Sequence, residues 1–186
     1  MNLPTLRTNR LVLEPFRRED IDELHALWAD ADVRRYLWDD EIISRERAVE
    51  TVEAALRAAD ANGVGMWTVR ESAQPSELIG FCGLRGVSEV DVELLYGLSP
   101  RYWRRGFATE AASVVLQYAF CELRLARVVA AADPDNRRSF GVLERLGMTP
   151  LPGGLPGSDL DFCAVVAVRG QLPLSCGEAN RAKIKI

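Results

Sequence analysis

The residues best suited to chemistry lie in one stretch, residues 92–111, with the sequence VELLYGLSPRYWRRGFATEA. The apolar run Val92–Leu98 predicts a strand, and apolar residues at every third or fourth position after Gly106 predict a helix. The turn between them is strongly basic. The first N–H groups of a helix are unpaired and carry the positive end of its dipole, so they bind anions. This junction therefore predicts a site for a diphosphate group.

Two common phosphate-binding patterns are absent from this turn. No Gly-Lys-Ser/Thr follows the glycine, so the turn is not a Walker loop and implies no magnesium ligand. A dinucleotide-binding fingerprint is also missing, because Gly106 has no glycine two residues before it. The first turns of the helix carry alanines on their apolar face, which lets the helix start lie close to a sheet and to a ligand.

The same stretch resembles the acetyl-coenzyme A loop of the GNAT superfamily of N-acetyltransferases, in particular the branch that acetylates ribosomal-protein N-termini. That branch carries a pattern like E-I-G-Y-W-L-x-P-x-Y-W-G-K-G-Y-A-T-E-A. The matching residues are Glu93, Tyr96, Leu98, Pro100, Tyr102, Trp103, Gly106, Ala108, Thr109, Glu110 and Ala111, with Arg105 for Lys and Phe107 for Tyr. Arg104 departs from the pattern, which often has Gly there, and Trp103 departs from the Gln or Arg of the wider superfamily.

The resemblance covers roughly residues 5–169 and implies one GNAT domain. Residues 170–186 are expected to be a C-terminal tail, because Gln171–Ile186 has no clear periodicity. The implied fold is α/β (α+β), with a mixed, mostly antiparallel central sheet and helices on both faces. The implied reaction moves an acetyl group from acetyl-CoA to a primary amine. The residues expected to bind the cosubstrate are Tyr96, Leu98, Arg104, Arg105, Gly106, Phe107, Ala108, Thr109 and Asn136.

Acetyl transfer needs a neutral amine, and Glu93 is the candidate general base, with Asp91 as a weaker one. Freeing an α-amino group with a pKa near 8 costs about 1 kcal/mol at pH 7, whereas a lysine near 10.4 costs roughly 4–5 kcal/mol. An N-terminal or small primary amine is therefore the easier acceptor for one carboxylate that works directly or through a water, and a protein N-terminal α-amino group is the expected one. No cysteine or serine is paired with a histidine, so direct attack is expected. The alternative for Glu93 is a solvent-facing strand residue.

The departing thiolate needs a hydrogen-bond donor, for which GNAT enzymes often use a tyrosine in a pattern like N-x-x-A-x-x-L-Y-E-K-x-G-F. The segment NRRSFGVLERLGM has Leu143 at the tyrosine position. Ser139 is the candidate catalytic donor, and Asn136 is expected to bond the pantetheine arm. The alternative for both residues is helix capping. The family also implies an oxyanion donor among the main-chain N–H groups of Tyr96–Leu98.

Further elements are predicted to frame this site. Strands are expected over Arg10–Phe16, Gly65–Glu71, Glu77–Leu84, Val92–Leu98, Arg127–Ala132 and Phe162–Val168. Helices are expected from Ile21 to Trp28, continued by Val33–Trp38, then from Ser44 to Asn62 and after Gly106. A last helix, capped by Asn136 or Asp135, is expected to end at Gly147. Met148–Ser158 is rich in Pro and Gly and is expected to be irregular. The acidic run Asp39–Glu41 is either an attractor for a cationic amine or a solvated loop.

Composition narrows the class of protein. A chain of 186 residues, 48% hydrophobic and with a mean hydropathy of -0.06, suits one soluble globular domain. A net charge of -4 argues against a nucleic-acid partner, and the sequence offers no membrane segment or signal peptide. Four scattered cysteines predict no metal site and a reducing cytoplasm, and the single His25 is expected to be structural.

Three questions of function stay open at this level. The acceptor is a protein N-terminus or a small-molecule amine such as an amino acid, polyamine or drug. A non-catalytic acyl-CoA-binding module is a further alternative, because Leu143 replaces the tyrosine and Met148–Ser158 is irregular. Either a monomer or a homodimer is compatible with the sequence.

Overall fold

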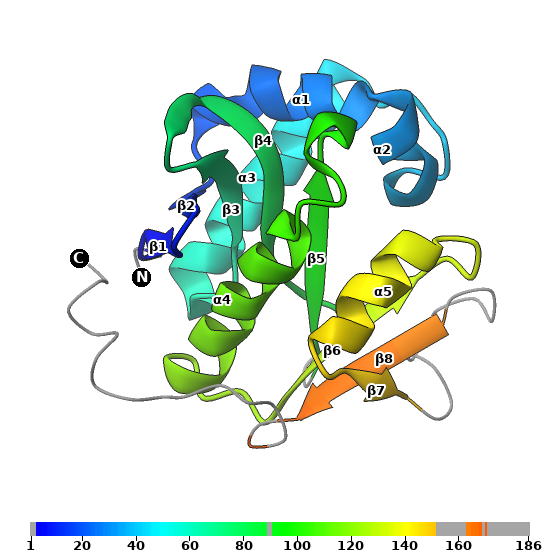
Figure 1. The fold of residues 1–186 in the computed structure, drawn as a ribbon. Coiled ribbons are helices and arrows are strands. Elements are labelled where there is room, and N and C mark those ends of the chain that lie inside the picture. The colour runs from blue at the N-terminus through cyan, green and yellow to red at the C-terminus, as the bar shows by residue number, and fades with distance from the viewer. Residues whose placement is uncertain (1–2, 89–90, 152–162, 169, 171–186) are drawn as a thin grey trace.

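The computed structural model describes residues 3–88, 91–151, 163–168 and 170, and it shows one sheet with helices on both faces (Figure 1). The strands lie in the order β1-β2-β3-β4-β5-β6-β8-β7. All neighbours are antiparallel except β5 and β6, which are parallel. This confirms the predicted fold class. The strands are β1 (Leu6–Arg7), β2 (Leu11–Pro15), β3 (Met66–Glu71), β4 (Gln74–Gly86), β5 (Val92–Leu98), β6 (Arg127–Ala132), β7 (Thr149–Pro150) and β8 (Cys163–Val168).

The α-helices form two layers, one on each face of the sheet (Figure 1). α1 (Ile21–Ala29), α2 (Ala31–Leu37) and α3 (Arg45–Asn62) share one apolar cluster with the sheet. α4 (Phe107–Cys121) and α5 (Arg137–Arg145) share a second cluster on the opposite face. Two short 3-10 helices complete the set, η1 (Arg18–Asp20) and η2 (Pro100–Tyr102).

The α4 helix packs as its apolar rhythm predicts. Its sheet-facing side chains are at most 1% exposed, namely those of Ala111, Ala112, Val115, Leu116 and Ala119. Burying each of the two larger ones stabilises the fold by roughly 1.5–3 kcal/mol. Because the first buried positions after Phe107 are alanines, the start of α4 lies close to the sheet, and the loop before it is held against the ends of the strands.

α1 and α2 are two helices rather than the predicted continued helix. The chain turns at Asp30, which has ψ 130° and ends α1. Its carboxylate accepts hydrogen bonds from the N–H groups of Asp32 at 3.0 Å and Val33 at 3.3 Å, so it caps a new helix. The break turns α2 toward β5, against which it packs.

β4 begins earlier than predicted, at Gln74 instead of Glu77, and it includes Pro75. The register between β3 and β4 shifts between Val69 and Glu71, which marks a β-bulge. Bulges and strand ends tolerate a proline because no ladder hydrogen bond is required there. The turn between the two strands therefore shrinks to Ser72 and Ala73.

The predicted irregular segment Met148–Ser158 contains the short strand β7 at its start. β7 lies at the edge of the sheet and pairs with β8, and an edge is where a strand accepts a proline such as Pro150. Residues 152–162 and the predicted tail after residue 170 lie outside the described residues.

β5 and β6 are paired at a single position, Glu93 with Val129. On its other side, β5 pairs with β4 along its whole length. Past this point the two parallel strands separate, and residues of both, Leu94–Leu98 and Ala130–Asp133, line a cavity. The middle of the sheet is therefore open where the family resemblance implies the oxyanion donor, because the main-chain groups on this edge of β5 have no strand partner.

Candidate active site

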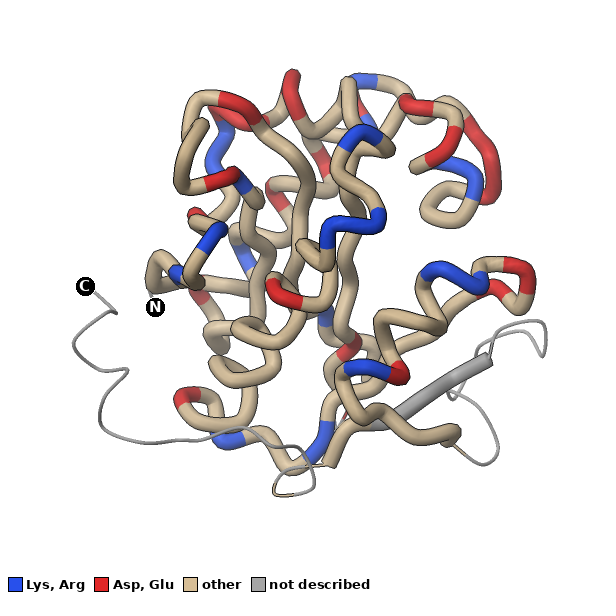
Figure 2. Tube along the Cα trace, in the orientation of Figure 1, with Lys and Arg blue, Asp and Glu red and all other residues tan. Residues whose placement is uncertain are grey.

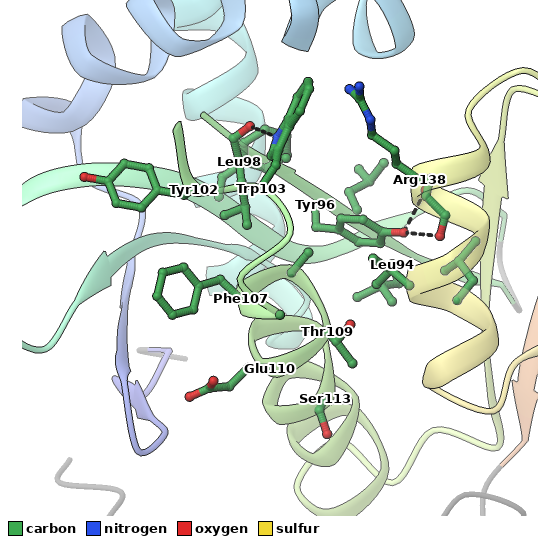
Figure 3. Close-up of a pocket in the computed structure, with 18 of the residues that line it drawn as sticks. Leu94, Tyr96, Leu98, Tyr102, Trp103, Phe107, Thr109, Glu110, Ser113 and Arg138 are labelled. Carbon is green, nitrogen blue, oxygen red and sulfur yellow. Dashed lines mark hydrogen bonds between the residues drawn. The ribbon is translucent and has the colours of Figure 1, made fainter. Parts of the chain in front are cut away.

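The separated strands open into a cleft of about 1490 Å³. It runs from the loop before α4, between α4 and α5, through the gap in the sheet to α2 on the other face. Figure 3 shows the part beside α4, with Tyr96 extending from β5 toward α5, and with Thr109 and Ser113 on the side of α4 toward α5. One cavity thus reaches both faces of the sheet, which suits a reaction between two ligands that enter from opposite sides.

The loop before α4 has the backbone conformation of an anion site. Gly106 caps α4 with φ 78°, and Arg104 has φ 60°. Both values lie in the left-handed region, which explains why a glycine is common at the position of Arg104. The first hydrogen bond of the helix runs from Glu110 N–H to the Gly106 carbonyl at 3.0 Å. The preceding N–H groups, those of Phe107–Thr109, have no partner within the helix and are left for a ligand.

Two ionic contacts fasten this loop to the far strands. The Arg105 guanidinium pairs with Glu71 of β3 at 2.7 Å and lies over the Phe107 ring at 4.5 Å. Arg10, which precedes β2, binds the Glu110 carboxylate, donates to the Arg105 carbonyl oxygen at 3.1 Å and lies over the same ring at 4.6 Å. The Arg105 side chain does not line the cleft. Its predicted role therefore falls on its backbone.

Glu110 accepts several of the hydrogen bonds that hold this region together, although the sequence alone assigned it no role. Its Oε1 accepts hydrogen bonds from the Thr8 hydroxyl and from the Arg10 N–H. Burial by itself raises the pKa of Glu110, and the hydrogen bonds from Thr8 and Arg10 outweigh that effect, so the pKa lies below its usual value. Glu110 therefore stays ionised and holds the loop at neutral pH.

Two further arginines, both from α5, line the cleft beside Arg104 and were missed from the sequence. The Arg138 guanidinium lies over the Trp103 ring at 4.3 Å. Arg145 donates to the Thr109 hydroxyl at 3.3 Å. Figure 2 shows basic residues both in the loop before α4 and along α5. No local signal marks these two arginines, because only the packing of α5 beside α4 brings them to the loop.

Tyr96 and Ser139, two of the predicted site residues, meet inside the cleft. The Tyr96 hydroxyl lies 2.7 Å from Ser139 Oγ and 3.1 Å from the Ser139 carbonyl oxygen (Figure 3). Asn136 caps α5 by accepting a hydrogen bond from Ser139 N–H at 3.1 Å, as the capping alternative predicts, and it also lines the cleft. Leu143, at the family's tyrosine position, is 1% exposed. The hydroxyl groups on this wall therefore come from Tyr96 and Ser139.

The two carboxylates predicted as bases are both ion-paired, and Glu93 lies where β5 and β6 pair. Glu93 is 4% exposed, and its Oε2 lies 2.5 Å from Arg85 Nη2. Asp91 is buried and is bound by Arg127 at 2.7 and 2.9 Å. Neither lines the cleft. Glu93 is therefore not the solvent-facing residue of the alternative, and the structure does not bring it to Ser139.

Strand alternation explains where Glu93 lies. Successive side chains of β5 point to opposite faces of the sheet, so Glu93 shares a face with Leu95, and Tyr96 points the other way. Leu95 packs with the α1–α3 cluster, whereas Tyr96 packs with the α4–α5 cluster. The cofactor-side hydroxyl groups and the Glu93 carboxylate are thus separated by the sheet.

The opposite wall of the cleft comes from α2 and is largely apolar. Its side chains are those of Tyr36 and Leu37, together with Phe81 of β4 and Leu95 of β5. Asp32, an exposed residue, is the one carboxylate that the described part of α2 adds to this wall. The acidic run Asp39–Glu41 is not part of the lining. An amine that enters from this side meets an apolar surface with one acidic group at its rim.

Comparison with known proteins gives the class of this chain. A sequence model described as an acetyltransferase (GNAT) domain matches residues 10–149, so the chain belongs to the GNAT acetyltransferase family. The chain is 31% identical over 147 residues to YoaA, an uncharacterized N-acetyltransferase of Bacillus subtilis (strain 168), over 77% of this chain and 82% of that one. It is 25% identical over 137 residues to spermidine N(1)-acetyltransferase of Escherichia coli (strain K12), over 74% of this chain and 72% of that one.

Solved structures agree with this assignment. An acetyltransferase from Agrobacterium tumefaciens str. C58 superposes with a TM-score of 0.81 at 26% identity, over 91% of this chain and 96% of that one. The ribosomal L7/L12 alpha-N-protein acetyltransferase RimL, solved in complex with coenzyme A, gives 0.74 at 15% identity over 89% and 98%, a likeness of fold alone. The protein is an acetyl-CoA-dependent N-acetyltransferase. The open N–H groups of α4 and the arginines around them fit the diphosphate of that cosubstrate.

Two further observations concern other kinds of site. Among the described residues, no group of three or more His, Cys, Asp or Glu side chains is arranged to hold a metal ion. His25 Nε2–H donates to the Ile43 carbonyl oxygen at 2.9 Å, a structural contact as predicted. No helix in the described part of the chain is long and apolar enough to cross a bilayer.

Proposed function

We propose that this enzyme acetylates the α-amino group of a peptide or amino-acid derivative whose first side chain is apolar, by direct attack of the amine on the thioester of acetyl-CoA. The diphosphate is held by the backbone of residues 105–109, and the acetyl group lies in the gap between β5 and β6. The amine arrives from the α2 side. The observation that carries this proposal is the continuous cleft, with a basic mouth on one face and an apolar wall on the other.

The proton balance favours an α-amino group as acceptor. An α-amino group needs about 1 kcal/mol to become neutral at pH 7, against roughly 4–5 kcal/mol for an alkylamine like that of lysine. Glu93 is the proposed proton acceptor, through an intervening water, and Arg85 already engages one of its oxygens. A carboxylate that is ion-paired and lies outside the cleft lining can give little help in removing a proton from a bound amine. It therefore suits an amine that loses its proton readily.

The apolar wall favours an acceptor with an apolar neighbour to the amine. Tyr36, Leu37, Phe81 and Leu95 offer van der Waals contacts, and Asp32 at the rim offers one charge. A polyamine carries several charges, each of which would lose hydration against such a wall. The oxyanion of the attacked thioester is proposed to accept from a main-chain N–H of Tyr96–Leu98, on the unpaired edge of β5.

A small-molecule amine is the second candidate acceptor, because one relative of this chain acetylates spermidine according to its name. The exposed acidic residues Asp39, Asp40 and Glu41 lie next to α2 and would attract such a cation. Asp40 is already paired with Arg34 at 3.0 Å, which reduces the charge available to a ligand. We therefore rank the polyamine after the α-amine.

A matched pair of amines tests the proposal. Phenylalanine amide and phenethylamine carry the same aromatic group, but the first has an α-amino group and the second an alkylamine. Thiol release from acetyl-CoA at pH 7 should give a kcat/KM about 100-fold higher for phenylalanine amide, because a far larger fraction of it is neutral. The two values should converge as the pH approaches 10.

Three outcomes decide between the candidates. A spermidine kcat/KM equal to or above that of phenylalanine amide at pH 7 would overturn the α-amine proposal and favour the polyamine. Equal values for the matched pair at pH 7 would overturn the proton argument. Stabilisation by acetyl-CoA without thiol release for any amine in the panel would instead identify an acyl-CoA-binding module.

A further inference from the structure

We propose that Tyr96 is a positioning residue for acetyl transfer: its hydroxyl group orients the Ser139 hydroxyl, which donates a hydrogen bond to the departing thiolate of coenzyme A. The role rests on the proposed direct attack at the thioester. It assigns the leaving-group contact to two hydroxyl groups from two elements, β5 and α5, where the family's own pattern has one tyrosine and this chain has Leu143.

The pair lies at the gap between β5 and β6, where the proposed function places the acetyl group. Both side chains line the cleft at the gap between β5 and β6, and Leu143 lies on the same wall. Leu143 is nearly fully buried and has no polar atom on its side chain. The Ser139 main-chain N–H is already engaged by Asn136. The hydroxyl of Ser139 is therefore the group of that residue that is available to a ligand.

The direction in which the Tyr96 phenol donates its hydrogen bond decides whether the Ser139 hydroxyl proton is free for a ligand. Its phenol has one proton and two acceptors in reach, the Ser139 carbonyl oxygen at 3.1 Å and Ser139 Oγ at 2.7 Å. When the phenol donates to the carbonyl oxygen, Ser139 donates to the phenol oxygen and has no proton left for the cleft. When the phenol donates to Ser139 Oγ, the serine proton is free to point at the sulfur. A rotation of two hydroxyl hydrogens, without movement of heavier atoms, connects the two states.

The pair donates hydrogen bonds and is not consumed as an acid. Burial raises the pKa of Tyr96, and its hydrogen bond with Ser139 offsets only part of that effect. An ordinary thiol has a pKa near 8.5, so a thiolate does not take a proton from such a phenol. In the reaction the N–C bond forms and the C–S bond breaks. The amine proton leaves through water to Glu93 or solvent, and the released thiolate takes its proton from water.

A mutant cycle tests this arrangement, with the amine that gives the fastest thiol release in the panel above. Ser139→Ala should lower kcat about 10- to 100-fold, the value of one hydrogen bond to a charged group. Tyr96→Phe should lower kcat about 3- to 10-fold and leave the KM for acetyl-CoA unchanged. The double variant should equal Ser139→Ala, because Tyr96 acts only through Ser139.

The pH profile and a matched control separate this role from others. The ratio of kcat for Tyr96→Phe and the unmodified protein should be the same at pH 7 and pH 9, because the phenol stays protonated at both. Tyr118→Phe removes another buried tyrosine hydroxyl, which donates to the Gly63 carbonyl oxygen away from the cleft. Tyr118→Phe should lower the Tm about as much as Tyr96→Phe does and leave kcat unchanged.

Each contrary result has a distinct meaning. Full kcat in Tyr96→Phe would overturn the role of Tyr96 and leave the proposed function intact. A double variant far slower than Ser139→Ala would show that Tyr96 contacts the sulfur directly. A ratio that approaches one at pH 9 would show that the phenol is an acid that has lost its proton. No thiol release by the unmodified protein with any amine would overturn the proposed function, and this role with it.

Discussion

The two ends of the cleft differ in how firmly their side chains are held. At the cofactor end, Arg105 of the loop is paired with Glu71 of β3, and Glu110 in the first turn of α4 is paired with Arg10, which precedes β2. At the acceptor end, Asp32 is exposed on a seven-residue helix, and Tyr36 stacks only with Arg35 of its own helix among the contacts of the described residues. The cofactor end is thus held by contacts between residues far apart in the chain, whereas the acceptor end is lined by side chains of one short helix.

The largest expected effect comes from Gly106→Glu at the cofactor end. The new side chain needs φ near 78°, which costs about 1 kcal/mol, and it places a carboxylate where the diphosphate binds. Coenzyme A affinity should fall at least 100-fold in calorimetric titration, with a small change in Tm. Gly86→Glu is the control, because an added Cβ there meets no atom within 4 Å. Affinity within threefold of the unmodified value would contradict the site.

The second-largest effect is expected at Glu110, whose ion pair with Arg10 anchors the loop before α4. Glu110→Gln keeps the shape of the side chain and removes the charge that holds Arg10, so coenzyme A should bind about 10-fold more weakly, the value of one charge-assisted hydrogen bond. Glu53→Gln is the control, because Glu53 pairs with Arg18 on another part of the surface. If both variants bind coenzyme A equally well, the anchor does not shape the loop.

The same carboxylate gives a pH dependence. The pKa of Glu110 is below its usual value of 4.5, so its stabilising effect is fully present above that pH and is lost as the pH falls through the lowered pKa. The unfolding free energy of the unmodified protein should therefore fall more steeply below pH 4.5 than that of Glu110→Gln, as measured by urea titration. Parallel curves would count against an ionised Glu110.

A smaller effect is expected at the acceptor end. Tyr36→Ala removes an aromatic contact worth about 1 kcal/mol, so the KM for phenylalanine amide should rise about fivefold. The KM for acetyl-CoA and the Tm should stay within error, because α2 does not hold the cofactor loop. Ile42→Ala, at a side chain that is 70% exposed and outside the cleft lining, is the control. A change in both KM values would mean that the two ends are coupled.

The smallest effect is expected for Glu93→Gln. If Glu93 takes the amine proton through water, kcat/KM for phenylalanine amide should fall about threefold at pH 7 and stay unchanged at pH 9, where most of the amine is already neutral. Arg85→Gln removes the ion-pair partner and keeps the carboxylate, so it separates the two roles. An unchanged pH–rate profile in Glu93→Gln would rule out the base.

The elements around the cleft were largely predictable because their signals are local. Alternation and apolar runs located β5, β6 and α4, and the cap of the last helix was narrowed to Asn136 or Asp135, of which the structure has Asn136. The helix break at Asp30 was missed. An aspartate inside a helical pattern can be an ordinary helix residue or a cap, and only the backbone conformation at Asp30 shows that it is a cap. The early start of β4 was missed because Pro75 reads as a turn until its bulge is seen.

The sequence by itself determined the local structure of the proposed cosubstrate site: a strand, a basic turn with Gly106 and an alanine-faced helix leave unpaired N–H groups within a few residues. Only the tertiary structure decided what surrounds it. Arg10 and Glu110 are 100 residues apart in the chain, and Tyr96 and Ser139 are 43 apart. Such pairs depend on how β2, β5 and α5 pack around one sheet. Strand alternation then fixes the face of the sheet on which each side chain lies, and it places the Glu93 and Tyr96 side chains on opposite faces.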